Sequence, residues 1–372
     1  MRIGVPKETA EGERRVALVP EIVGKLTGQG HEVMVERGAG AEALIPDSQF
    51  EEAGAKLVDA AWDGDVVVKV APPSAEEIRK LARGSVLIGF LAPLTNADGV
   101  RSLADAGVTS FGLEVVPRIS RAQSMDALSS QSNVAGYRAA LFGAQEMGRF
   151  YPMLMTAAGT IRPATVLVLG VGVAGLQAIA TARRLGAIVQ GFDVRPEVAD
   201  QVRSLGATWL DVGVEAAGEG GYARELTEEE RAQQQQGLQE AIAKVDVAIT
   251  TALVPGRRAP ILVTEEAVKG MKPGSVVVDL AGEAGGNCEC SEPGQTVIRH
   301  DVKIMAPLNI VSTMAEHASQ LYARNIEALL ALMTSESGAL ELDFEDEIIA
   351  GACVTRDGEI VNERAKAAVA AA

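Results

Sequence analysis

The stretch Thr165-Val-Leu-Val-Leu-Gly-Val-Gly-Val-Ala-Gly175 decides the fold of this 372-residue chain. It joins an apolar run to three glycines spaced as G-x-G-x-x-G, and an alanine-rich helical segment follows over 176–185. A second apolar run, 187–192, ends at Asp193. This order predicts strand, tight turn, helix, strand and acid, which is the arrangement of a dinucleotide-binding βαβ unit.

Each glycine of this turn has its own physical role. Gly170 permits the sharp turn, Gly172 lets the backbone approach a pyrophosphate, and Gly175 lets helix and strand pack closely. We expect the phosphates at the helix N-terminus, beside Val173 and Ala174, because free N–H groups and the helix dipole favour anions there.

An acidic residue stands where such a unit contacts the ribose. Asp193 follows the turn by about 20 residues, the distance at which a carboxylate accepts from the ribose hydroxyls of NAD. Because this carboxylate would repel a 2′-phosphate, the predicted cofactor is NAD(H) rather than NADP(H). Val194 and Arg195 belong to the same predicted site.

A membrane helix is the competing interpretation of this stretch. Positions 163–182 carry no charge, a length that can cross a bilayer. The three glycines, and Pro163 before a run of valine and leucine, favour the entry to a buried parallel strand instead. We therefore expect no direct insertion into a membrane.

The bulk composition limits the partners and the compartment. A net charge of −16 argues against nucleic acid and against direct docking on an anionic membrane, while leaving protein partners open. Cys288, Cys290 and Cys353 make neither a disulfide framework nor zinc-ligand spacing, so no metal site is predicted. The chain enters a strand from its first residues, so we expect no signal peptide and a cytoplasmic location.

Strand and helix patterns alternate along the chain, which is typical of doubly wound α/β domains. In the first third the expected strands are 3–5, 32–36, 65–70, 86–91 and 108–113, with helices at 20–28, 75–81 and 97–105. A long helix is predicted over about 132–150, and later strands over 208–210, 245–250, 275–279 and 302–306. A long helix over 314–333 and a strand-like run over 348–354 close the chain, whose tail can fold back onto the first domain.

Loops after the strands of the second domain are expected to face the ligand. Leu253, Gly282 and Asn309 fall on this rim by position. The glycine-rich 213–221 and the acidic, glutamine-rich 222–240 predict a long surface loop, and such loops in compact domains are often lids.

Three histidines, His31, His300 and His317, are candidates for acid–base work. A dehydrogenase acting on a hydroxy or amino acid needs a group that moves the substrate proton, and histidine often does this. None of the three follows a first-domain strand, so we expect each to be structural. The sequence therefore indicates that no proton is shuttled to such a substrate.

The chain resembles two related groups at several stretches. They are Met1-Arg-Ile-Gly-Val-Pro-Lys-Glu8, Glu13-Arg-Arg-Val-Ala-Leu-Val-Pro20, the glycine turn, Leu253-Val-Pro-Gly256 and 274–279. The groups are the alanine dehydrogenases and the NAD(H)-binding component of proton-translocating nicotinamide nucleotide transhydrogenase. This resemblance implies two Rossmann-like, doubly wound parallel-sheet domains joined by long helices, with NAD in the cleft. It places the N-terminal domain at 1–128 plus 318–372 and the NAD-binding domain at 129–317.

Some features of the alanine dehydrogenases are matched and others are missing. Arg15 and Lys69 match the residues that hold the substrate in that group. The catalytic histidine of that group would fall within 89–94, where no histidine stands, and its catalytic aspartate matches Glu283.

The segment 118–133 resembles a loop of the transhydrogenase component that brings polar groups onto the nicotinamide. By that match Arg118, Gln123 and Asp126 contact or aim the ring, with Ser129 beside them. The stretch 220–225, which contains Tyr222, resembles the mobile loop that closes over the nucleotide, although the residues after it depart from the pattern.

The resemblance implies a hydride transfer between two nucleotides. Hydride passes from NADH to NADP⁺ held by a partner subunit, coupled to proton movement across the membrane, in an enzyme of the Si/Re-specific type. The implied partners are a second copy of this chain and the NADP(H)-binding and membrane-domain subunits, which places the chain at the cytoplasmic membrane without insertion. An alanine dehydrogenase and a non-catalytic NAD-sensing module are the alternatives.

Overall fold

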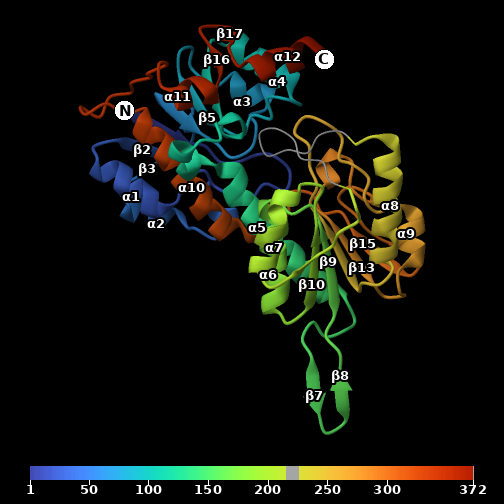
Figure 1. The fold of residues 1–372 in the computed structure, drawn as a ribbon. Coiled ribbons are helices and arrows are strands. Elements are labelled where there is room, and N and C mark those ends of the chain that lie inside the picture. Colours follow the sequence, from blue (N-terminus) through green and yellow to red (C-terminus); the bar gives the residue numbers. More distant parts are fainter. Residues whose placement is uncertain (215–225, 372) are drawn as a thin grey trace. The chain divides into compact units, whose positions relative to one another are not determined.

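The chain folds into two compact units in the computed structural model, which describes residues 1–214 and 226–371. One unit is Met1–Gln131 with Val311–Ala372, and the other is Ser132–Ile310 (Figure 1). Each contains a mostly parallel sheet with helices on both faces. The predicted fold class, two Rossmann-like α/β domains, is therefore confirmed. The long helix α5 (Ala127–Glu146) runs from the first unit into the second.

The sheet of the first unit has the strand order β17-β16-β6-β5-β4-β1-β2-β3. All its strands from β3 to β6 are parallel, and the two strands from the tail are antiparallel. Their bounds are β1 Arg2–Val5, β2 Glu32–Glu36, β3 Lys56–Val58, β4 Val66–Val68, β5 Val86–Gly89, β6 Thr109–Gly112, β16 Cys353–Arg356 and β17 Glu359–Ile360.

Alternate residues of these strands pack on opposite faces. In β4, Val66 and Val68 join the core under α1 (Pro20–Gly28) and α10 (Ala315–Leu332), whereas Val67 faces α4 (Ala97–Asp105) and α12 (Glu363–Ala371). β-branched residues suit such a pleated surface buried on both sides. The shorter helices are α2 Asp47–Glu52 and α3 Ala75–Ile78, and a 3-10 helix, η3, spans Ser120–Met125.

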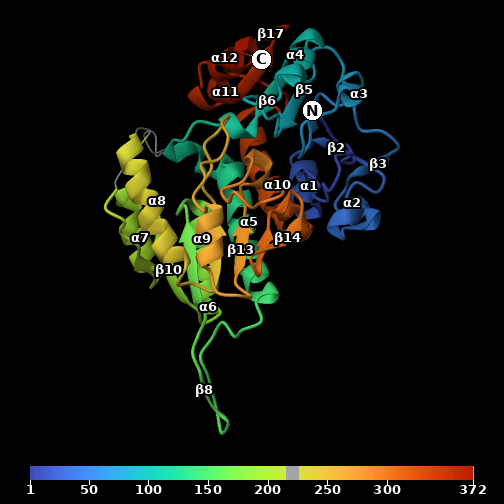
Figure 2. The same cartoon turned by 90° about the vertical axis from the view of Figure 1, so that its right-hand side faces the viewer.

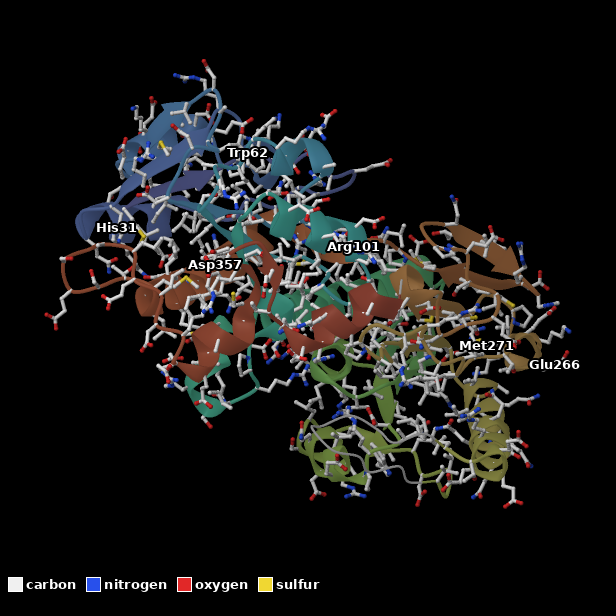
Figure 3. All side chains as sticks on the ribbon, turned by 90° about the horizontal axis from the view of Figure 1, so that it is seen from above. His31, Trp62, Arg101, Glu266, Met271 and Asp357 are labelled. Carbon is white, nitrogen blue, oxygen red and sulfur yellow. The ribbon has the colours of Figure 1, made fainter. Side chains whose placement is uncertain are left out.

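The tail returns to the first sheet, where β16 pairs with β6. The strand-like run predicted over 348–354 is wrong in its first half, because Glu347–Ala352 forms the helix α11. Asp346 caps this helix by accepting from the N–H groups of Ile348 and Ile349, and such a cap outweighs local β propensity. Arg101 of α4 donates to the carbonyl of Val369 at 2.6 Å and fastens α12 to the unit (Figure 3).

The sheet of the second unit has the order β11-β10-β9-β12-β13-β15-β14. Its six parallel strands follow the 3-2-1-4-5-6 order of a Rossmann fold, with β14 added antiparallel at the edge. The bounds are β9 Thr165–Leu169, β10 Ile188–Phe192, β11 Thr208–Trp209, β12 Val247–Thr250, β13 Val276–Asp279, β14 Thr296–Arg299 and β15 Val302–Met305. The predicted strands of this domain lie within one to three residues of these bounds.

Helices cover both faces of this sheet. Side chains of α5, α6 (Val173–Arg184) and α7 (Ala199–Ser204) pack on one face, and those of α8 (Glu228–Ile242) and α9 (Glu265–Gly270) pack on the other. The long loop predicted to run to residue 240 is wrong beyond residue 227, where α8 begins. Thr227 and Glu230 form a capping box there, and Leu238 and Ile242 supply its buried side.

A two-stranded hairpin, which the sequence patterns do not predict, projects from the second unit. It consists of β7 (Leu154–Thr156) and β8 (Gly159–Ile161), which pair only with one another in the described structure (Figures 1 and 2). Gly159 takes a φ of 126°, a backbone conformation that favours glycine and marks the turn. Among the described residues, no helix has both the length and the apolar character needed to cross a bilayer.

Candidate functional site

The glycine turn follows β9 and leads into α6, as the sequence predicts. Gly170 has a φ of 90°, and a Cβ there would lie 2.9 Å from the backbone nitrogen of Ala252. A Cβ on Gly175 would lie only 2.0 Å from the carbonyl oxygen of Gly170, so helix and turn are in direct backbone contact. A Cβ on Gly172 would meet no protein atom within 4 Å. The middle glycine therefore has open space in front of it, while its two neighbours are required for packing.

The N-terminus of α6 has the features of an anion site. Gly172 is its N-cap, and no side chain caps the helix. Val173 and Ala174 form the first turn, where backbone N–H groups and the helix dipole favour a phosphate. From α5, Gly136 approaches so closely that a Cβ on it would lie 2.0 Å from the carbonyl oxygen of Ala174. Sequence reasoning missed Gly136, although a glycine inside a long helical pattern often marks such a close approach.

Asp193 lies at the carboxyl end of β10, beside the glycine turn. Its Oδ2 accepts from the backbone N–H of Val171 at 2.8 Å. Its two oxygens also accept from Nε and Nη2 of Arg195, at 2.8 Å each. Burial raises the pKa of Asp193, but the hydrogen bonds from Arg195 and Val171 outweigh it, so the pKa lies below its ordinary value. The carboxylate is therefore charged near neutral pH, as a contact to ribose hydroxyls requires.

A small pocket adjoins Asp193 at the ends of β10 and β11. It is lined by Phe192, Asp193, Val194, Pro196, Trp209, Leu210, Asp211, Val212 and Val214. Mostly apolar walls with one carboxylate at the edge suit a flat aromatic ring attached to a ribose. Val194 and Arg195 therefore lie where the sequence predicts the nucleotide.

The loop after β12 contacts the glycine turn. The hydroxyl of Thr251 donates to the carbonyl of Gly170 at 2.7 Å. The buried side chain of Asn287 accepts from the N–H of Ala252 at 3.1 Å and donates to its carbonyl at 2.9 Å. Leu253, predicted on the rim, follows directly and is 53% exposed. Thr251 and Asn287 escape sequence reasoning, because only their hydrogen bonds, and no sequence motif, connect them to the turn.

Asn309 also lies at this edge of the second unit. It follows β15 and has a φ of 43°, which asparagine tolerates better than most residues. Its N–H donates to Oε1 of Glu283 at 2.9 Å. Glu283, the residue that matches the catalytic aspartate of alanine dehydrogenases, thus holds the loop that carries Asn309. Gly282, the other predicted rim residue, is buried in the 3-10 helix Gly282–Ala284.

The four predicted nicotinamide residues lie together in the first unit, at the junction of η3 and α5. Asp126 immediately precedes α5, and its carboxylate accepts from the N–H of Ser129 at 2.9 Å and from its hydroxyl at 2.6 Å. Gln123, in η3, and Arg118, just before it, are exposed. The helix begins at Ala127 rather than near 132 because Asp126 caps it.

Arg15 and Lys69 are both buried and paired within the first unit. Arg15 donates to both oxygens of Glu13, with Nε at 2.8 Å and Nη2 at 2.6 Å. Burial raises the pKa of Glu13, yet the hydrogen bonds and charge of Arg15 lower it to about 2. Lys69 Nζ lies 3.0 Å from Glu8 and 3.0 Å from Glu77.

Glu114 is a further buried acid, at the ends of β5 and β6. Its Oε1 accepts from the N–H groups of Leu91 and Ala92 at 2.8 and 2.7 Å, while its Oε2 is buried without a hydrogen-bond partner. Burial raises the pKa of Glu114 to about 7. Ala92, within the stretch where alanine dehydrogenases carry their histidine, has a φ of 50°. No sequence motif marks Glu114.

Tyr222 lies outside the described residues, as does the stretch 220–225. No group of three or more acids, histidines or cysteines in the described ranges of the chain could hold a metal ion. His300 forms a pair with Glu265 at 2.9 Å in the turn between β14 and β15. His31 is buried, with Nδ1 unpartnered.

Comparisons with known proteins show the family. The profile described as "Alanine dehydrogenase/PNT, N-terminal domain" matches residues 4–135, and that described as "Alanine dehydrogenase/PNT, C-terminal domain" matches residues 139–363. The chain therefore belongs to the alanine dehydrogenase/PNT family, which confirms the resemblance stated from the sequence.

Individual relatives separate the two groups within this family. The chain is 50% identical over 376 residues to the first segment of "NAD(P) transhydrogenase subunit alpha" of Rhodospirillum rubrum, covering 97% of this chain and 98% of that protein. It is 33% identical over 375 residues to an alanine dehydrogenase of Mycobacterium tuberculosis, covering 98% of this chain and 95% of that protein. A solved transhydrogenase structure from Sinorhizobium meliloti matches with a TM-score of 0.88 and 46% identity over 97% of this chain and 100% of that one. The chain is thus more similar to the transhydrogenase subunits.

Proposed function

We propose that this chain is the NAD(H)-binding subunit of a proton-translocating NAD(P) transhydrogenase. The observation that carries the proposal is the 50% identity, along 97% of the chain, to a protein named as the first segment of a transhydrogenase alpha subunit. A name that describes only one segment of a subunit also supports the existence of partner chains. The glycine turn, the free N-terminus of α6 and the charged Asp193 supply the binding groups that a dinucleotide needs.

The nucleotide bound by this chain is NAD(H), with NADP(H) on a partner subunit. Asp193 accepts from ribose hydroxyls, and its negative charge disfavours a 2′-phosphate at the same place. The pocket lined by Trp209 and Leu210 takes the adenine ring, and the phosphates lie over Gly172, where the backbone leaves open space. Val173, Ala174, Leu253 and Asn309 line the remainder of the site.

The reaction is a hydride transfer from C4 of NADH to C4 of NADP⁺, of the Si/Re-specific type. It carries no proton, so the protein has to orient two rings and exclude water rather than supply an acid or base. Gln123 and Ser129 hold the carboxamide and the ribose. Asp126 and Arg118 form the polar pair that aims the ring. The hydrogen bonds from Ser129 to Asp126 support this grouping, because they fix one member by another.

The partners are a second copy of this chain and the NADP(H)-binding and membrane-domain subunits. The hairpin β7–β8 supports a homodimer. Its two strands make an isolated sheet, which is marginal alone, and Met155 and Ile161 are 73% and 47% exposed on it. A second copy covers these side chains. The chain itself stays on the cytoplasmic side, attached to the membrane through its partners.

A reconstituted hydride transfer tests this function. Purified chain is mixed with the NADP(H)-binding domain of a transhydrogenase, NADH and an NADP⁺ analogue, and reduction of the analogue is followed by absorbance. We expect transfer that depends on both proteins. Absence of transfer, with NADH binding intact, would favour a non-catalytic NAD sensor. Turnover of NADH by the chain alone with pyruvate and ammonia, at ordinary dehydrogenase rates, would make it an alanine dehydrogenase.

A further inference from the structure

Asn325 bonds to both ends of the segment that carries Asp126. It lies on α10 and is 7% exposed. Its Nδ2 donates to the carbonyl of Ser124 at 2.8 Å, and its Oδ1 accepts from the hydroxyl of Ser130 at 2.7 Å. A carbonyl can only accept, so the amide nitrogen must face Ser124, and the orientation of the side chain follows. One amide therefore joins the end of η3 to the first turn of α5.

The segment between these two contacts contains the predicted nicotinamide groups. Asp126 and Ser129 stand inside it, and Gln123 directly precedes it. Asp126 caps α5 from within the same segment. The contacts of Asn325 thus fix the two points from which the orientation of Asp126 and Ser129 is set.

The helix that carries Asn325 is itself firmly held. One turn earlier, Tyr322 is fully buried and donates its hydroxyl proton to the carbonyl of Lys69, in the first sheet, at 2.7 Å. Gln131 of α5 donates to the carbonyl of Ala318 at 3.1 Å. Asn325 therefore projects from a rigid support, which is what accurate placement of a neighbouring loop requires.

The contact of Asn325 with Ser130 continues into a buried polar network. Gln131 donates to the hydroxyl of Ser130 at 3.2 Å and accepts from Nη1 of Arg15 at 2.9 Å. Arg15 in turn is bound by Glu13, which accepts from the hydroxyl of Ser312 at 2.7 Å.

An apolar residue would also suit the position of Asn325, because most of the buried face of α10 is apolar. A buried amide is favourable here only because its bonds to Ser124 and Ser130 are both made. Those bonds give direction to the loop rather than bulk to the core.

We propose that Asn325 is a positioning residue for hydride transfer, which holds the segment from Ser124 to Ser130 in the geometry that aims the nicotinamide. This inference rests on the proposed function of that segment. Binding of NAD(H) depends mainly on the second unit, so loss of Asn325 should impair orientation far more than affinity.

The test compares Asn325→Leu with Thr355→Val in the full chain. Thr355 is a buried hydroxyl in the same unit, bonded to Ser110 at 2.7 Å, so its loss costs a comparable hydrogen bond away from the loop. We expect Asn325→Leu to slow single-turnover transfer from NADH at least about tenfold, with the Kd for NADH changed less than about twofold. Thr355→Val should leave both unchanged at a similar loss of thermal stability. Equal slowing by both variants, or by neither, would overturn the proposal.

Two further measurements cover other outcomes. Ser130→Ala removes one side of the contact without touching α10, and it should slow transfer in the same direction if Asn325→Leu does not fold. Hydrogen exchange judges the contact without the reaction: the amides of Ser129 and Ser130 should exchange at least about tenfold faster in Asn325→Leu than in Thr355→Val. Equal exchange would refute the positioning role. If the unaltered chain transfers no hydride, the proposed function fails, while the exchange result still decides whether Asn325 orders this segment.

Discussion

The carboxylate of Asp193 is bound from two sides, by the guanidinium of Arg195 and by the backbone of the glycine turn. Nε and Nη2 of Arg195 donate to its oxygens at 2.8 Å each, and the N–H of Val171 donates at 2.8 Å. The same acid therefore holds the turn and a neighbouring cation in place. Its negative charge at this point is what separates NAD(H) from NADP(H) in the proposed site.

Asp193→Asn should reduce the preference for NAD(H). The amide keeps an acceptor for Val171 but loses the charge, which leaves Arg195 as a cation beside the place of a 2′-phosphate. We expect the ratio of the NADPH and NADH dissociation constants to fall by about tenfold or more, since each 1.4 kcal/mol is a factor of ten. Fluorescence titrations with both nucleotides measure it. The matched control is Asp200→Asn, which removes an exposed ion pair with Arg203, also at 2.8 Å. An unchanged ratio in Asp193→Asn would remove this residue from the ribose site.

Asp126→Asn should slow hydride transfer much more than it weakens NADH binding. Asparagine caps helices as well as aspartate does, so α5 keeps its start while the charge that pairs with the ring-orienting groups is lost. We expect transfer to fall by about tenfold to a hundredfold, with the Kd for NADH within about threefold. Single-turnover transfer and a binding titration give the two numbers. Thr264→Asn, an exchange of the cap of α9, is the control. Equal losses in rate and affinity would contradict an orienting role.

Alanine at the second and third glycines of the turn should have opposite effects. A Cβ on Gly172 meets no protein atom within 4 Å, whereas one on Gly175 would lie 2.0 Å from the carbonyl oxygen of Gly170. Gly172→Ala should therefore keep its melting temperature and lose NADH affinity. Gly175→Ala should lose about 1–3 kcal/mol of stability through overpacking. Thermal unfolding and NADH titration of both variants check this, and a loss of stability in Gly172→Ala equal to that in Gly175→Ala would refute the assignment.

The glycine turn and both parallel sheets could be predicted because their signals are local. The run Thr165–Leu169 and the spacing of three glycines determine strand, turn and helix within about 30 residues. Helix α8 escapes prediction because glutamines carry no amphipathic signal, and its start depends on a capping box at Thr227. The run 348–354 resembles a strand because the sequence does not show that Asp346 would cap a helix first.

The candidate site could be predicted only where one segment contains the chemistry. Asp126 and Ser129 are three residues apart, so their pairing is visible in the sequence. Asn325 and Ser124 are separated by 201 positions, and no pattern connects them. Thr251 and Asn287 escape notice for the same reason. What brings these groups together is the packing of whole elements, which a periodicity does not describe.

The hairpin predicts the effect of a charge on self-association. Met155 is 73% exposed on β7, and we propose that a second copy covers it. Met155→Asp should place a charge in that apolar contact and weaken the dimer by at least about a hundredfold, while thermal stability of the separate chain stays the same. Sedimentation velocity over a range of concentrations measures the association. Ile298→Asp, at a 65% exposed apolar side chain on β14, adds the same charge elsewhere. A dimer equally stable in both variants would exclude the hairpin from the interface.

The buried acid Glu114 predicts how stability depends on pH. Its pKa rises from the ordinary 4.5 to about 7 in the folded chain, because its carboxylate is removed from water. Below pH 4.5 the group is protonated whether the chain is folded or not. Between pH 4.5 and 7 the folded chain keeps a proton that the unfolded chain releases, so the stability due to Glu114 falls as pH rises, and the loss is complete above pH 7.

Glu114→Gln should remove this dependence. Glutamine mimics the protonated acid, and its carbonyl still accepts from the N–H groups of Leu91 and Ala92. Relative to the unaltered chain, the variant should gain about 1–3 kcal/mol of stability between pH 5 and pH 8. Denaturant midpoints across this range, with Glu76→Gln at an exposed position of α3 as the control, measure the difference. A difference that stays constant with pH would show that Glu114 titrates in the folded chain as it does in the unfolded one, and that its unpartnered Oε2 is reached by water.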